Sequence, residues 1–106
     1  MTDEIFPAGV DNVLSDLGFD DAEELSTKTV LAIKLNDVMD ARGLNQSQAA
    51  MIVGMTQPKI SQIRNYRLQN ISLERLMHAL VALDQDVEIV VRPAKRKHRG
   101  AIRVAA

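Results

Sequence analysis

The residues best suited to chemistry are two glutamines and a lysine in the stretch TQPKISQI, namely Gln57, Lys59 and Gln62. All three side chains donate hydrogen bonds, and the two amides also accept them. Amides pair bidentately with the edge of adenine in the major groove of DNA, and lysine pairs with guanine or phosphate. The same residue types are also common on any protein surface. Their spacing therefore predicts recognition by hydrogen bonding, with an ordinary solvated surface as the alternative.

A short helix is expected to carry these side chains. The hydroxyl of Thr56 can cap it by reaching the Lys59 amide, and Pro58 falls in the first turn, where its missing N–H is not needed. Only Ile60 and Ile63 are large and apolar in this helix, so they must hold it against the core. The opposite side is left to face a partner outside the domain.

A second short helix precedes it with almost no connecting chain. Asn45 and Gln48 have the spacing of a capping box, and Gly54 is placed to end this helix after about two turns. A turn this tight forces the two helices to cross steeply, which requires a residue that tolerates positive φ and a small side chain at the crossing. Gly54 and Ala50 meet these needs. The pair is predicted to be a helix-turn-helix.

Two longer patterns frame this pair and predict the rest of the bundle. Residues 20–42 form a long helical pattern that is followed by a glycine. A last helix begins after Ser72, with Glu74 near its positive end. Its apolar stripe comprises Leu73, Leu76, Met77, Leu80 and Val81. With 46% hydrophobic and 3% aromatic residues, the 106-residue chain is expected to be one mainly α domain, a small helical bundle.

The residues after the last helix change period and predict a β-strand. Apolar residues alternate from Val87 to Val91 and Pro93 ends the run, so residues 85–93 are assigned to the strand. A single strand cannot satisfy its own backbone, and its partner would be its copy in a second subunit, residues 101–104 or another protein. We favour a homodimer, because it would set two recognition helices about 34 Å apart on one face of a DNA duplex.

Charge is distributed unevenly along the chain, although the formal net charge is only −1. Eight of the 14 acids and none of the 13 bases precede Lys28. Residues 1–19 are therefore an acidic arm, which also contains apolar residues, ahead of a helix-turn-helix domain over residues 20–84. Residues 94–106 are a basic tail that can follow phosphates. Because charges more than about 10 Å apart are largely screened, a small net charge does not exclude an anionic partner.

The stretch LNQSQAAMIVGMTQPKISQI resembles the helix-turn-helix of the phage-repressor (Cro/CI, or XRE) family. More widely, NVLSDLGFDDAEEL, SLERLMHAL and DVEIVVRP resemble HigA-like antitoxins of toxin–antitoxin operons, over about residues 12–93. The resemblance implies a lambda-repressor-like fold and a sequence-specific repressor that binds operator DNA. It also implies an antitoxin that represses its own operon and neutralises a RelE/HigB-type toxin, with the acidic arm as the toxin contact. The alternatives are a stand-alone phage-type regulator without a toxin and a nucleoid-type binder that uses charge alone.

The resemblance also assigns roles to individual residues. The family positions that face bases are matched by Gln57, Pro58, Lys59 and Gln62. Those that hold phosphates are matched by Asn45, Gln46 and Asn65. Arg64 and Arg67 add positive charge that suits phosphates on either side of the groove. Many members have a glycine just after the recognition helix, where this chain reads RNYRLQN, so Asn65 is expected to take the left-handed conformation instead.

The residue types that enzymes and metal sites need are scarce. The chain has no cysteine, its two histidines, His78 and His98, are far apart, and no Gly-rich phosphate loop occurs. An enzyme, a metal site and a bound cofactor are therefore not expected. No apolar run approaches the roughly 20 residues of a membrane span, and no signal peptide is recognisable, so a cytoplasmic location is expected.

Overall fold

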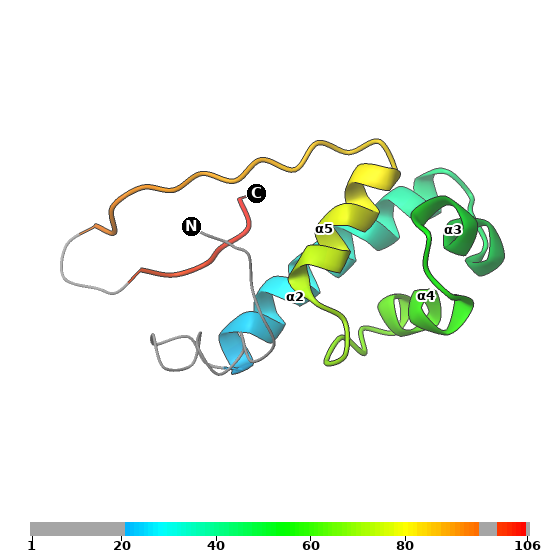
Figure 1. The fold of residues 1–106 in the computed structure, drawn as a ribbon, viewed down its shortest axis with the longest axis horizontal. Helices are drawn as coiled ribbons and strands as arrows, with labels where there is room; N and C mark the ends of the chain where they lie inside the picture. The colour runs from blue at the N-terminus through cyan, green and yellow to red at the C-terminus, as the bar shows by residue number, and fades with distance from the viewer. Residues whose placement is uncertain (1–20, 96–99, 106) are drawn as a thin grey trace.

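The computed structural model describes residues 21–95 and 100–105, and four α-helices lie within these ranges (Figure 1). They are α2 (Asp21–Ala41), α3 (Gln46–Val53), α4 (Gln57–Arg64) and α5 (Leu73–Ala82). The predicted helical bundle with its helix-turn-helix is confirmed. The acidic arm, residues 1–19, lies outside the described residues. None of the four helices is long and apolar enough to cross a membrane.

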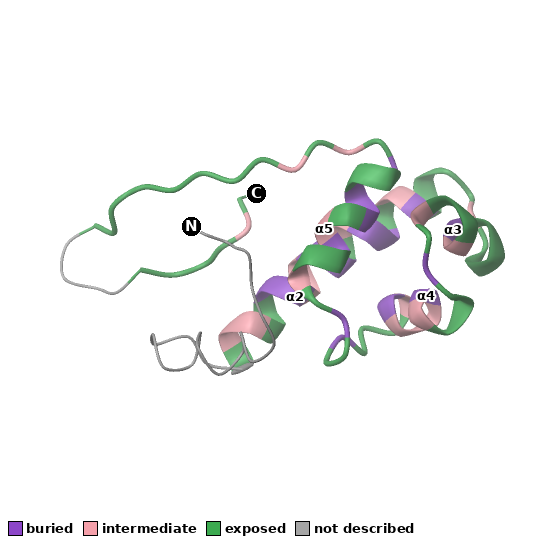
Figure 2. Cartoon of the chain, in the orientation of Figure 1, coloured by how far each residue is buried: buried purple, intermediate pink, exposed green. Residues whose placement is uncertain are grey.

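The four helices share one core. α5 lies along α2, while α3 and α4 sit together at one end of this pair, and the buried faces turn inward (Figures 1 and 2). The buried apolar residues are Leu31, Ala32, Leu35, Met39, Ala49, Met55, Ile60, Ile63, Leu68, Ile71, Leu76, Ala79, Leu80 and Leu83. Leu76 and Leu80 confirm the predicted stripe of α5, whereas Val81 is exposed at its edge.

Side-chain caps fix where three of the helices begin. At α3, Asn45 Oδ1 accepts from Gln48 N at 2.8 Å and Gln48 Oε1 accepts from Asn45 N at 2.9 Å, which completes the predicted capping box. At α4, Thr56 Oγ1 accepts from Lys59 N at 3.4 Å, and Ser72 caps α5 in the same way. Each cap satisfies an N–H that the helix itself leaves unpaired, so these starts depend on neighbouring residues alone.

Each helix is followed by a residue in the left-handed conformation. These residues are Gly43, Gly54, Tyr66 and Asp84, with φ of 63°, 73°, 58° and 65°. The prediction that Asn65 adopts this conformation after α4 is wrong, since its φ is −103°. Asn65 donates to Ser61 O through both its backbone N–H, at 3.0 Å, and its side-chain Nδ2, at 2.9 Å. These bonds keep Asn65 in the last turn, so the chain reverses one residue later, at Tyr66.

The predicted β-strand at residues 85–93 is not formed. The described ranges contain no strand, and Ile89, Val90 and Val91 are 72%, 63% and 91% exposed. Across these ranges, no backbone hydrogen bond joins this segment to residues 100–105. Alternating apolar residues favour a strand only when a second backbone is available to pair with. Among the described residues no second backbone pairs with it, and the segment runs as irregular extended chain.

The far end of the tail returns to α2. Thr27 Oγ1 donates to Ile102 O at 3.4 Å, and Val104 packs partly against the core. Thr27 belongs to the N-terminal half of α2, whereas α3 and α4 lie at the other end of that helix (Figure 1). The suggestion that the basic tail, residues 94–106, follows DNA phosphates stays a prediction, because residues 96–99 lie outside the described ranges.

Candidate nucleic-acid interface

The turn between α3 and α4 and the two isoleucines of α4 hold the short helix pair from behind. Gly54 is needed for its φ of 73° and not for space, since nothing lies within 4 Å of where its Cβ would be. Ala49 is fully buried, whereas Ala50, predicted at the crossing, is only partly buried. Ile60 and Ile63 are each 1% exposed and anchor α4 as predicted. The outer side of α4 is therefore what the domain presents.

The four residues predicted to face bases differ in how accessible they are. Gln57 and Pro58, in the first turn of α4, are exposed. Lys59 is half-buried, and its Nζ donates to Asn70 O at 3.2 Å in the loop after α4. Gln62 is also half-buried. Gln57 and Pro58 are thus free to meet a partner, whereas Lys59 is already bonded to Asn70.

Gln62 has a hydrogen-bond acceptor that is not satisfied. Its Oε1 is out of contact with solvent and accepts no hydrogen bond from a described residue. A buried acceptor without a donor costs about 1–3 kcal/mol. Turning the side chain outward, to water or to a donor on a partner, would remove this cost.

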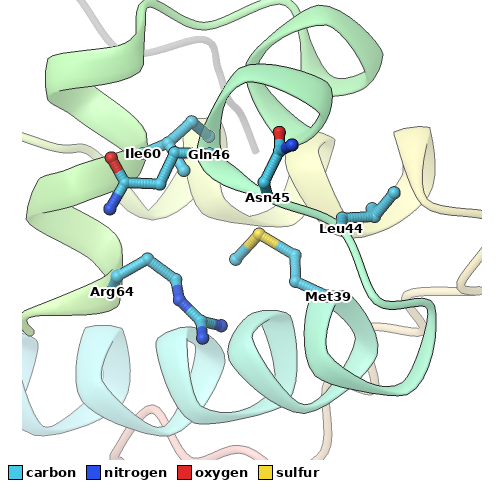
Figure 3. Close-up of a pocket in the computed structure, with 6 residues that line it drawn as sticks. All are labelled: Met39, Leu44, Asn45, Gln46, Ile60 and Arg64. Atoms are coloured by element: carbon cyan, nitrogen blue, oxygen red, sulfur yellow. The ribbon is translucent and has the colours of Figure 1, made fainter.

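The residues predicted to hold phosphates surround the start of α3 and the end of α4. Asn45 and Gln46 are exposed and line an open pocket of about 280 Å³ (Figure 3). The other residues lining this pocket are Met39, Leu44, Ile60 and Arg64. Asn65 and Arg67 are exposed just after α4, and Arg67 forms no ion pair within the described ranges. These four positions are accessible to a ligand as they stand.

Arg64 is bound to α2. Its Nη2 donates to Asp40 Oδ1 at 2.7 Å, and its Nη1 donates to the side-chain and backbone oxygens of Asn36 at 3.2 and 3.3 Å. Asn36 is only 6% exposed, and its Nδ2 donates to Ile63 O at 3.2 Å. Arg64 therefore lines the same pocket as Asn45 and Gln46, but its guanidinium is already bonded to α2.

These contacts come from a row of residues on α2 that sequence reasoning missed. The α2 row consists of Glu24, Lys28, Ala32, Asn36 and Asp40. A spacing of four residues places them along one line of a helix. Lys28 is buried, its Nζ donates to Leu68 O at 3.3 Å, and it pairs with Glu24 at 3.3 Å. The spacing could be found in the sequence, but the chain segments that the row would meet could not.

The charge around α4 is positive and comes from few residues. No acid occurs in residues 41–72. Since Arg64 is paired with Asp40, the bases of α4 and its following loop that have no carboxylate partner in the described ranges are Lys59 and Arg67. Cations without a carboxylate partner suit the phosphates of a nucleic acid, and the neutral amides beside them suit hydrogen bonding to the edges of its bases. Within the same ranges, no group of His, Cys, Asp and Glu could hold a metal ion.

Comparison with known proteins agrees with this geometry. A family model described as a helix-turn-helix domain matches residues 13–92. A solved structure, assigned provisionally by its name as an XRE family transcriptional regulator, is 51% identical to this chain. The match covers 82% of this chain and 99% of that chain, with a TM-score of 0.76. No curated protein matches the chain. The matched family region spans all four helices.

Proposed function

The chain belongs to this family of helix-turn-helix domains, and from that membership we propose that it is a transcriptional repressor that reads operator DNA through α4. The observation that carries the proposal is the exposed first turn of α4. Gln57 and Pro58 face outward there, while Ile60 and Ile63 hold the opposite side in the core. The major groove of B-DNA admits such a helix, and each base pair presents a distinct pattern of donors and acceptors in it.

The residues proposed to face bases divide into two groups, those that can bind as they stand and those whose side chains must first rearrange. Gln57 can pair bidentately with adenine without rearrangement, and Pro58 offers an apolar surface to a thymine methyl group. Lys59 and Gln62 join on binding, since Lys59 must leave Asn70 and Gln62 gains a partner for its buried Oε1. Loss of the Lys59 bond to Asn70 is a cost that correct bases repay and wrong bases do not.

Contacts to phosphates flank this reading surface. Asn45 and Gln46 at the start of α3, and Asn65 and Arg67 after α4, are exposed on either side of the first turn of α4 along the chain. Such contacts fix the register of the protein on the duplex and carry no sequence information directly. Arg67 also contributes charge, so it should account for about 0.9 of the slope of log affinity against log salt.

The active form that we propose is a homodimer. One recognition helix reads only a few base pairs, whereas a two-fold pair reads two half-sites about 34 Å apart. The apolar side chains of Ile89, Val90 and Val91 are exposed in the single chain and are candidates for burial between subunits. Sedimentation of the purified protein at increasing concentration tests this assembly, and a monomer at the concentration that binds operator contradicts it.

We further propose that the repressor is an antitoxin that regulates its own operon. The support is the resemblance to HigA-like antitoxins and the acidic arm, residues 1–19, whose charge complements a basic RelE/HigB-type toxin. Deletion of residues 1–19 is expected to abolish co-purification with the product of an adjacent toxin gene and to spare DNA binding. Co-purification that survives the deletion would exclude the arm as the main contact, and a gene without such a neighbour favours the stand-alone regulator.

The test of DNA reading is fluorescence anisotropy of the purified full-length chain. It is measured on the duplex upstream of its own gene and on a scrambled duplex, each at two salt concentrations. Gln57→Ala is compared with the wild type, and Gln85→Ala is the control, because it removes an amide after α5 that bonds Leu83 O. Loss of one bidentate base contact should weaken binding to the upstream duplex by about 1–3 kcal/mol, or about 5- to 160-fold.

The two duplexes distinguish reading from simple attraction. The proposal expects the wild type and Gln85→Ala to prefer the upstream duplex and Gln57→Ala to lose most of this preference. Equal and steeply salt-dependent binding to both duplexes by the wild type would identify a charge-driven binder without an operator. A preference that survives in Gln57→Ala would remove this residue from the reading surface.

A further inference from the structure

We propose that Asn36, Asp40 and Arg64 form a clamp between α2 and α4 that positions the recognition helix, and that Arg64 acts through this clamp instead of contacting a phosphate. The inference rests on the proposed function, because it concerns how α4 is presented to DNA. It assigns a positioning role to two residues of α2, Asn36 and Asp40, and changes the role expected for Arg64.

The clamp joins the last turn of α4 to the α2 row through directional bonds. Asn36 Nδ2 donates to Ile63 O at 3.2 Å, a carbonyl in the final turn that also accepts from Tyr66 N at 3.2 Å. Asn36 Oδ1 and O both accept from Arg64 Nη1, and Asp40 Oδ1 accepts from Nη2 at 2.7 Å. Both terminal nitrogens of the Arg64 guanidinium thus donate to oxygens of α2.

α4 needs such a device because it offers little apolar surface. It has eight residues, of which Ile60 and Ile63 are buried. Apolar contacts are not directional, so two isoleucines resist removal of the helix from the core more than rotation about its axis. Hydrogen bonds from a buried side chain to one backbone carbonyl do depend on direction. The clamp therefore fixes the rotation of α4 about its own axis, and with it the direction in which Gln57 points into the groove.

The alternative role for Arg64 is a phosphate contact, and it makes opposite predictions. Arg64 would have to leave Asp40 and Asn36 to reach DNA, so removing the charge of Asp40 would release it and tighten binding to any duplex. If Arg64 is part of the clamp, the same change disturbs α4 and weakens operator binding. The sign of the Asp40→Asn effect on operator affinity separates the two.

The chain contains a second link of the same chemistry that does not touch α4. Arg42 Nη2 donates to Leu83 O at 2.6 Å and to Asp84 Oδ2 at 3.2 Å, which ties the end of α2 to the end of α5. Like Arg64, it joins an arginine to an aspartate and a backbone carbonyl on a neighbouring element. Arg42→Met is thus a matched control for loss of an interhelical arginine.

The experiment compares Arg64→Met, Arg64→Lys, Asp40→Asn, Arg42→Met and Arg67→Met with the wild type as full-length proteins. Anisotropy is measured on the upstream and scrambled duplexes over a range of salt, at a temperature below the unfolding midpoint of every variant. The readouts are the ratio of the two affinities and the salt slope. Arg64→Lys keeps the charge but loses the planar fork, so it tests geometry without changing the net charge.

The clamp predicts that all three changes at Arg64 and Asp40 lower the ratio by about fivefold or more, the smallest effect of losing one bidentate base contact. Arg64→Met should leave the salt slope unchanged, whereas Arg67→Met should reduce it by about 0.9. Arg42→Met should change neither readout. The lysine variant is the most informative, because a phosphate contact would tolerate it.

Two results would overturn the clamp. One is a uniform loss of affinity for both duplexes in Arg64→Met, with the slope reduced by about 0.9 and tighter binding by Asp40→Asn. The other is an unchanged ratio in Arg64→Lys and Asp40→Asn. A wild-type protein without preference for the upstream duplex would instead reject operator reading itself, and the clamp with it.

Discussion

α4 and α5 both pack against α2, but they are held in different ways. α5 buries Leu76, Ala79 and Leu80 along one stripe, so the hydrophobic effect is the main contribution to its position. α4 buries two isoleucines and depends in addition on polar bonds from the α2 row to its last turn and to the following loop. A helix that must keep one side free for a ligand has fewer apolar residues to spare for its own anchoring. Directional bonds at its end supply what the core does not.

α4 and α5 also differ in the residue with positive φ that follows each of them. Tyr66 and Asp84 both have positive φ and both donate to the carbonyl three residues earlier, at 3.2 and 2.9 Å. Aspartate adopts this conformation more readily than bulky residues do, and Asp84 also pairs with Arg42 at 3.2 Å. Tyr66 is 45% exposed, and its hydroxyl makes no hydrogen bond within the described ranges. The end of α4 therefore carries a conformational cost that its own contacts do not offset.

The largest effect that would test this comparison is the loss of apolar packing in α5. Leu76→Ala is expected to lower the free energy of unfolding by about 2–5 kcal/mol, because Leu76 is fully buried. Urea unfolding followed by circular dichroism measures this change. Val81→Ala on the same helix is the control, and its effect should stay within about 0.5 kcal/mol because the side chain is exposed. Similar values for both variants would mean that the stripe does not hold α5.

A smaller effect is expected from the α2 row. Lys28→Met removes the donor to Leu68 O and leaves Glu24 without its partner, so it should lower the free energy of unfolding by about 1–3 kcal/mol. Lys34→Met on the same helix removes the same charge where no hydrogen bond or ion pair within the described ranges is lost, and should change it by less than about 0.5 kcal/mol. Equal effects in urea unfolding would show that charge and not the bond matters at position 28.

The smallest effect concerns the two left-handed helix ends. Tyr66→Gly should raise the free energy of unfolding by roughly 0.5–1 kcal/mol, because glycine removes the steric cost of positive φ but loses more backbone entropy. Asp84→Gly should gain less, since it also loses the ion pair with Arg42. Thermal unfolding of the two variants side by side measures the difference. A larger gain at position 84 would contradict the view that α5 ends in a compensated turn and α4 does not.

Features that depend on nearby residues were predictable from the sequence. The capping box of Asn45 and Gln48, the Thr56 cap and the turn at Gly54 each involve residues at most four positions apart. The anchoring of α4 by Ile60 and Ile63 follows from helical spacing. Gln57 was predicted to be accessible because the cap and the isoleucines leave no other orientation for the first turn.

Features that depend on distant residues were not predictable in this way. Arg64 reaches Asn36 and Asp40, and Lys59 reaches Asn70, through contacts whose geometry exists only once the helices are packed. The strand prediction failed for a related reason, since alternation describes one face of residues 85–93 but cannot supply the second backbone that a strand requires.

The sequence by itself determined where α3, α4 and α5 begin, how α3 turns into α4 and which residues α4 turns inward. Local hydrogen bonds and periodicity are sufficient for these, because their partners lie within one or two helical turns. Only the tertiary structure decided which polar residues of α4 are free and which are occupied. Gln57 and Arg67 remain open, whereas Arg64 is held by α2, because side-chain partners 24 and 28 residues away come into reach only through the packing of α2 against α4.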